Sequence, residues 1–223
     1  MLAHPSPTRS QSAPLIGGLT VLAIAAIAMA LPPSPIATAA GTEGLGILQS
    51  TGLFSAGMAE QNAANDFGFL ALDITEAHPD RRALWQQELD VVARRRYAVY
   101  GWIDTRRAKG KELSLVGTLN LTGVYVYGPD APACAREIRA ANSDLDVIAV
   151  APAGSKVDAG AKDVGIAVDL KTWLASSKGE IANPVLIADQ LSEADKHKAV
   201  EHARALAGKD GKPKLLIASI AIE

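Results

Sequence analysis

The chain has 223 residues, a formal net charge of −2 with both signs mixed along it, and a single cysteine, Cys134. One cysteine excludes a disulfide framework, so stability must come from packing, and we expect Cys134 to be a small apolar filler of a helix. The even charge gives no indication of nucleic-acid binding, and an aromatic content of 4% argues against a stacking surface for long sugar chains.

Residues 1–39 have the pattern of a secretory signal peptide. Arg9 precedes an uncharged apolar run, Leu15–Leu31, and the small-residue site Ala37-Thr38-Ala39 follows three nearby prolines. This pattern predicts export, to the periplasm or the medium. A run of 17 residues, 15–31, also approaches the length that spans a bilayer, so an uncleaved membrane anchor is the alternative.

The next segment, 40–65, is rich in Gly, Ala, Ser and Asn without a clear period, which indicates a linker or flexible arm. We expect one folded domain over residues 66–223.

Within 66–223, short apolar runs alternate with amphipathic stretches. The runs are continuous rather than alternating, which is typical of strands buried on both faces of a parallel sheet. They cover residues 69–74, 97–104, 123–128, 146–152, 164–170, 184–191 and 214–222.

The stretches between these runs predict helical crossovers. Asp130 and Ser192 are suited to N-caps, Arg94 to the end of a helix, and Gly208 to a helix stop. About seven strands joined by helices predict an α/β fold, a parallel (β/α) barrel of the TIM type that is possibly incomplete, with an open doubly wound sheet as the alternative. No glycine-rich dinucleotide fingerprint or P-loop follows the first run.

Aspartates recur at the ends of these runs. The candidate site residues are Asp73, Glu76, Asp104, Asp169 and Asp189. In parallel strands these ends share one rim, where (β/α) barrels bind ligands. A carboxylate ring suits acid and base chemistry on a glycosidic bond, and it also suits a divalent cation, although no cofactor is required.

Each aspartate has a simpler interpretation as a helix cap or turn former, and Arg106 or Arg107 could pair with Asp104. If Asp73 and Asp104 instead form a catalytic pair on adjacent strands, mutual repulsion should raise the pKa of one of them.

The segments "GFLALDITE", "RYAVYGWID" and "LTGVYVYG" resemble the early strands of glycosidase-type (β/α) barrels, over residues 67–128. The resemblance implies a carbohydrate-active barrel, and no motif is close enough to transfer a catalytic residue. The run "DVIAVAP" carries no carboxylate at its end, where such enzymes usually have a glutamate. A second function therefore stays open: a non-catalytic extracytoplasmic accessory or binding subunit, docked on a membrane protein complex. The expected partners are a carbohydrate or other small molecule, or that complex.

Overall fold

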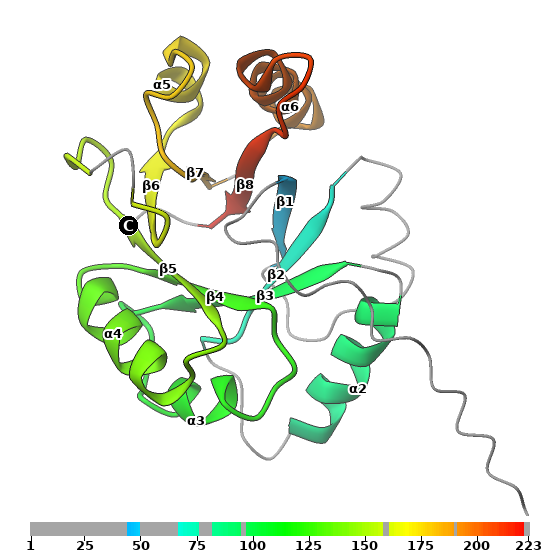
Figure 1. Ribbon diagram of the computed structural model, residues 1–223, viewed down its shortest axis with the longest axis vertical. Coiled ribbons are helices and arrows are strands. Elements are labelled where there is room, and N and C mark those ends of the chain that lie inside the picture. Colours follow the sequence, from blue (N-terminus) through cyan, green and yellow to red (C-terminus); the bar gives the residue numbers. More distant parts are fainter. Residues whose placement is uncertain are drawn as a thin grey trace, which may run out of the picture. The chain divides into compact units, whose positions relative to one another are not determined.

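The computed structural model describes residues 44–49, 67–75, 82–94, 97–157, 161–189 and 191–220. Eight parallel strands follow one another in chain order and close into a barrel, because the first strand pairs with the last (Figure 1). The predicted parallel barrel is confirmed, and the expected count of about seven strands is corrected to eight. The open doubly wound sheet is ruled out by closure.

Seven of the eight strands, β2 to β8, coincide with the apolar runs of the sequence. The strands are β1 (Gly44–Gln49), β2 (Phe69–Asp73), β3 (Ala98–Asp104), β4 (Gly123–Tyr127), β5 (Asp146–Ala151), β6 (Val164–Val168), β7 (Pro184–Ala188) and β8 (Lys214–Ser219). Their central residues are buried, as expected for strands covered by side chains inside the barrel and by helices outside it.

The strand that the sequence did not reveal is β1, "GLGILQ", which lies within the segment expected to be an arm. The domain therefore begins before residue 66, and that boundary was wrong. Strand β1 pairs in parallel with both β2 and β8, with Ile47 opposite Leu70 on one side and Ile217 on the other. It thereby removes two exposed sheet edges. The ring of Phe69 occupies the space that a Cβ at Gly46 would need, so a glycine in β1 allows a large side chain from β2.

Five helices are described outside the barrel. They are α2 (Arg82–Arg94), α3 (Glu112–Val116), α4 (Ala131–Ala141), α5 (Leu170–Ala175) and α6 (Glu193–Ala207). Helices α5 and α6 lie beside each other in Figure 1.

The ends of these helices follow the sequence signals in most cases. The side chain of Ser192 accepts a hydrogen bond from the Asp195 amide at the start of α6, and Gly208 ends that helix with a positive φ of 75°. Arg94 closes α2 as expected. Asp130 occupies the N-cap position of α4, but its side chain makes no capping hydrogen bond, so only part of that prediction holds.

The barrel interior is filled unevenly. Large rings come from β2, β3 and β4, and smaller side chains come from the opposite strands, including Ala167 and Ala218. The rings of Phe69 and Tyr100 meet edge to face at 5.3 Å, and Tyr125 lies 5.4 Å from Tyr100. These contacts make the interior a packed core rather than a channel.

The amino-terminal end of the barrel contains a partly buried polar pair. The Tyr100 hydroxyl donates to Oδ2 of Asp146 at 3.4 Å. Burial raises the pKa of Asp146, a neighbouring negative charge at Asp163 adds to that, and the Tyr100 bond and the Arg139 charge only partly oppose it. The pair needs a glycine at position 123, because a Cβ at Gly123 would clash with both Tyr100 and Asp146.

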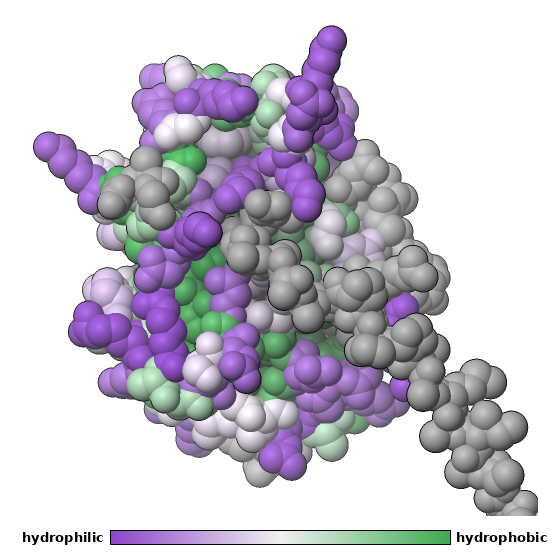
Figure 2. Space-filling model, viewed as in Figure 1, coloured by the Kyte–Doolittle hydropathy of each residue, from purple (hydrophilic) through white to green (hydrophobic). Residues whose placement is uncertain are grey.

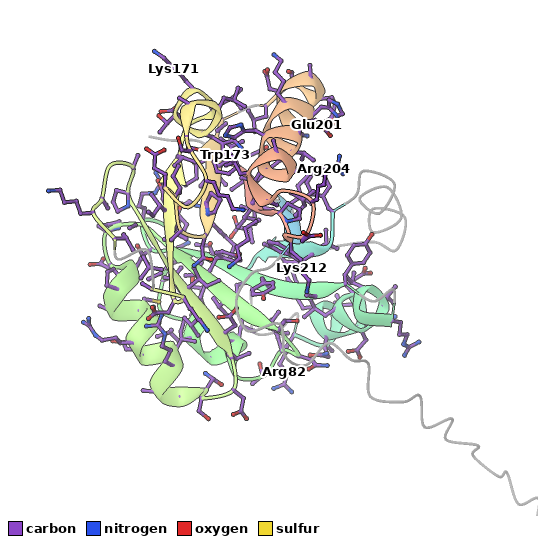
Figure 3. The ribbon with its side chains drawn as sticks, turned by 45° about the horizontal axis from the view of Figure 1, so that its top comes forward. Arg82, Lys171, Trp173, Glu201, Arg204 and Lys212 are labelled. Carbon is purple, nitrogen blue, oxygen red and sulfur yellow. The ribbon has the colours of Figure 1, made fainter. Side chains whose placement is uncertain are left out.

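Helices α5 and α6 pack through Trp173, which Figure 3 shows between them. Its indole Nε1 donates to the Ala199 carbonyl at 3.0 Å, and its ring meets the edge of His202. On the face shown in Figure 2, hydrophilic residues cover much of the described surface and apolar residues appear between them. None of the described helices has the length and apolarity needed to cross a bilayer. Residues 1–39, which carry the predicted signal or anchor, lie outside the described part of the chain.

Candidate functional site

The carboxyl-terminal rim of the barrel carries four of the five predicted site residues. Side chains alternate in direction along a strand, and each of these aspartates follows an interior residue by two positions. The interior residues are Ala71, Trp102, Ala167 and Ile187, and the aspartates are Asp73, Asp104, Asp169 and Asp189. Glu76, the fifth predicted residue, lies outside the described residues.

Asp73 and Asp104 lie on neighbouring strands and are joined by arginines from the loop after β3. Nη2 of Arg107 donates to Oδ2 of Asp73 at 2.7 Å, and its Nε lies 3.5 Å from Oδ2 of Asp104. Arg106 binds Asp104 in a fork, with Nε to Oδ1 at 3.0 Å and Nη2 to Oδ2 at 2.7 Å. The cluster of Asp73, Asp104, Arg106 and Arg107, here called the rim cluster, therefore pairs two carboxylates with two guanidinium groups.

The charges of the rim cluster are unfavourable for a general acid at Asp104. Burial of Asp104, whose side chain is 1% exposed, raises its pKa, but the Arg106 hydrogen bonds and the charges of Arg106 and Arg107 outweigh burial and lower it. A general acid needs a raised pKa, so Asp104 has the opposite tuning. Repulsion was expected to raise the pKa of one of the two aspartates; the pKa of Asp104 is instead lowered, mainly by Arg106 and further by Arg107.

Both aspartates also shape the backbone. Oδ1 of Asp73 accepts from the Thr75 amide at 3.0 Å, and Oδ1 of Asp104 accepts from the Arg106 amide at 3.0 Å. These are turns formed by an aspartate side chain and the backbone two residues later. The Thr75 hydroxyl accepts a hydrogen bond from the buried backbone amide of Asp104 at 2.9 Å, and this bond connects the two turns.

The other two aspartates are separate from the rim cluster in their contacts. Asp169 caps α5, with Oδ1 accepting from the Thr172 amide at 2.7 Å and Oδ2 from its hydroxyl at 3.0 Å. The Thr172 amide bond is the main reason that the pKa of Asp169 is lowered. Asp169 therefore has the helix-cap role that the sequence also allowed. Asp189 is exposed.

An aromatic stack adjoins the rim cluster. The Trp102 ring lies 6.3 Å from Tyr125 and 5.5 Å from Tyr127, both nearly parallel. The Arg106 guanidinium lies over the Tyr127 ring at 5.1 Å from its centroid, a cation–π contact. Tyr127 was not predicted as a site residue, although it lies two positions after Tyr125 and so shares its face. Within the described residues, the buried Nε1 of Trp102 has no hydrogen-bond acceptor.

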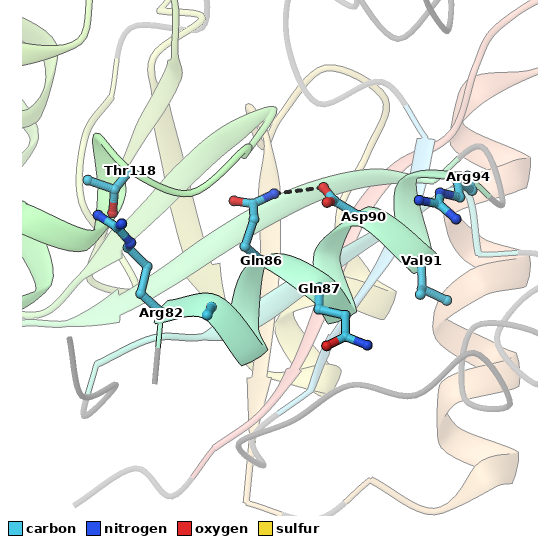
Figure 4. Close-up of a pocket in the computed structure, with 8 residues that line it drawn as sticks. Arg82, Gln86, Gln87, Asp90, Val91, Arg94 and Thr118 are labelled. Carbon is cyan, nitrogen blue, oxygen red and sulfur yellow. Dashed lines mark hydrogen bonds between the residues drawn. The ribbon is translucent and has the colours of Figure 1, made fainter. Parts of the chain in front are cut away.

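Two further features bear on ligand binding. A surface groove runs along α2 from Arg82 to Arg94 and reaches Thr118, with Gln86 donating to Asp90 inside it (Figure 4). None of the residues that line it belongs to a strand. Among the described residues, no group of three His, Cys, Asp or Glu side chains is placed to hold a metal ion.

No protein-family model and no curated protein sequence matches the chain. Among solved structures, the crystal structure of D-psicose 3-epimerase in the presence of D-fructose is similar, with a TM-score of 0.41 and 12% sequence identity. The match covers 81% of this chain and 86% of that one. The strand order of this chain by itself defines the class of protein, a closed eight-stranded parallel (β/α) barrel.

Proposed function

We propose that this barrel binds a hydroxyl-rich small molecule of the carbohydrate class at the rim formed by β2, β3 and β4, and that it does not hydrolyse it. The observation that carries the proposal is the rim cluster itself, in which Arg107 joins Asp73 to Asp104 beside the Tyr127 ring. The Arg107 side chain is 42% exposed, so a ligand at the rim can reach its guanidinium group.

Chemistry supports binding over hydrolysis. Convergent polar groups beside an aromatic wall are typical of small-molecule sites, and the rim of a (β/α) barrel is their usual place. A glycosidase needs one carboxyl that stays protonated near neutral pH. Asp104 is held in its charged form by Arg106 and Arg107, which favours a fixed polar contact over proton transfer.

The test is a binding and turnover assay on a panel of monosaccharides, disaccharides and aryl glycosides. Titration calorimetry should detect binding of at least one sugar. Arg107→Ala should weaken that binding at least about tenfold, equal to about 1.4 kcal/mol. Arg204→Ala is the matched control, since Arg204 pairs with Glu201 on the surface of α6, where Figure 3 labels both.

Two results would reject the proposal. One is that no sugar in the panel binds. The other is that an aryl glycoside is hydrolysed and Asp104→Asn abolishes turnover while the folded state persists, which would show a hydrolase.

Export and the accessory role stay predictions, because the signal pattern and most of the expected docking arm lie outside the described residues. The intact mass of the protein from an envelope fraction tests cleavage after residue 39. Co-purification with a membrane complex tests the accessory subunit.

A further inference from the structure

A second cavity lies outside the barrel, between α3, α4 and the outer face of β3. Its volume is about 280 Å³. Three carboxylates line it, Glu112, Asp130 and Glu137, together with apolar walls that include Ile103 and Leu113. All lining residues belong to the described part of the chain, and none of them is basic.

Glu112 is the unusual member of this group. Only 3% of it is exposed, although a buried carboxylate is costly without partners. Its Oε1 accepts from the Lys109 amide at 2.9 Å, while within the described residues its Oε2 is buried and has no hydrogen-bond donor. A native structure normally supplies a donor to such an oxygen, so the second oxygen calls for one from a ligand.

Cys134 also lines the cavity, and the carboxylates affect its thiol. Burial raises the pKa of the Cys134 thiol, and the charges of Glu137, Glu112 and Asp130 raise it further. All three carboxylates therefore act on the thiol of Cys134. Asp130 and Glu137 are exposed, whereas Glu112 lies deep, so the charges are spread along the cavity.

We propose that this cavity binds a short aliphatic diamine, with one ammonium group donating to Glu112 and the other lying near Asp130 and Glu137. The apolar wall would contact the hydrocarbon between them. A metal ion fits less well, because no three acidic or sulfur ligands among the described residues converge on one point. A diamine instead matches charges that are separated along a partly apolar cavity.

The experiment uses the full chain and 1,4-diaminobutane as the probe, with n-butylamine and 1-butanol as comparisons. Calorimetry measures affinity, and the alkylation rate of Cys134 reports occupancy, because it is the only cysteine of the chain. We expect the diamine to bind with a Kd below about 1 mM, to bind more tightly than butylamine, and to slow alkylation of Cys134.

Two variants locate the ammonium groups. Glu112→Gln keeps the length of the side chain but removes the charge, and it should weaken binding of both amines at least about tenfold. Asp130→Asn combined with Glu137→Gln should remove the advantage of the diamine over butylamine. Glu201→Gln is the matched control on exposed α6 and should leave binding unchanged.

The proposal fails if about 10 mM diamine gives neither heat nor protection of Cys134. It also fails if Glu112→Gln binds as wild type does, if 1-butanol binds as tightly as the amines, or if Ca²⁺ binds and the amines do not. Failure here leaves sugar binding at the rim untouched, since the two sites share no residue.

Discussion

Replacing Asp104 by asparagine tests whether the rim cluster holds the barrel together. Asparagine retains the Oδ1 contacts to the Arg106 amide and Nε. Its amide nitrogen would face Nη2 of Arg106, which now donates to Oδ2 at 2.7 Å, and Nε of Arg107 at 3.5 Å. The substitution therefore removes charge-assisted bonds and places donors against donors.

The size of the effect follows from burial. Removing one partner of a fully buried ion pair costs about 3–5 kcal/mol. Asp104 is buried, but the arginine side chains are 28% and 42% exposed and can regain water. We therefore expect Asp104→Asn to lower the free energy of unfolding by about 2–3 kcal/mol at pH 7.

Equilibrium urea unfolding measures this difference. The matched control is Asp163→Asn, because Asp163 pairs with Arg139 at 3.2 Å but its side chain is 57% exposed. Exposed pairs contribute little, so the control should lose less than about 1 kcal/mol.

The pH dependence adds an independent check. The folded-state pKa of Asp104 lies below its usual value of 3.8, so its stabilisation is complete above that value and is lost as the pH falls through the folded-state pKa. Wild type and Asp104→Asn should therefore converge below about pH 4. Equal losses in the two variants, or a difference that does not change between pH 7 and pH 3, would refute the reasoning.

Three further predictions concern other parts of the barrel. Asp146→Asn should raise the melting temperature at pH 7, because the raised pKa of Asp146 means that the folded state disfavours its charged form. The advantage of the variant over wild type should shrink as the pH falls toward 3.8. A lower melting temperature of the variant at pH 7 would contradict this. Asp169→Ala should remove the cap of α5 and lower the free energy of unfolding by about 1 kcal/mol in urea, while sugar binding at the rim stays unchanged. Gly46→Ala should cost at least about 1–3 kcal/mol through overpacking against Phe69, and Phe69→Leu in the same chain should recover part of it; an additive double variant would show that the two residues are independent.

The class of fold and the direction of the rim aspartates could be predicted from the sequence, because both depend on local patterns. Continuous apolar runs separated by helical stretches indicate buried parallel strands, and a spacing of two from an interior residue sends a side chain to the same face. Helix ends such as Ser192 and Gly208 are also local, since a cap contacts only its own first or last turn.

Other features depended on contacts between distant residues. Strand β1 contains two glycines in six residues, and it becomes a strand because β2 and β8 supply partners on both sides and Phe69 fills the space above Gly46. Local propensity could not reveal that, since the stabilising contacts come from residues elsewhere in the chain.

The contacts of the rim aspartates also depend partly on residues that are distant in the sequence. Asp73 and Arg107 are separated by 34 residues, and only the adjacency of β2 and β3 brings them together. Arg107 thereby joins two carboxylates that were expected to repel each other. The lowered pKa of Asp104 comes mainly from Arg106, two residues along the chain, and Arg107 adds to it. The Arg106 contact is therefore local, whereas the link between Asp73 and Arg107 depends on which strands are neighbours, and that is set by the tertiary structure.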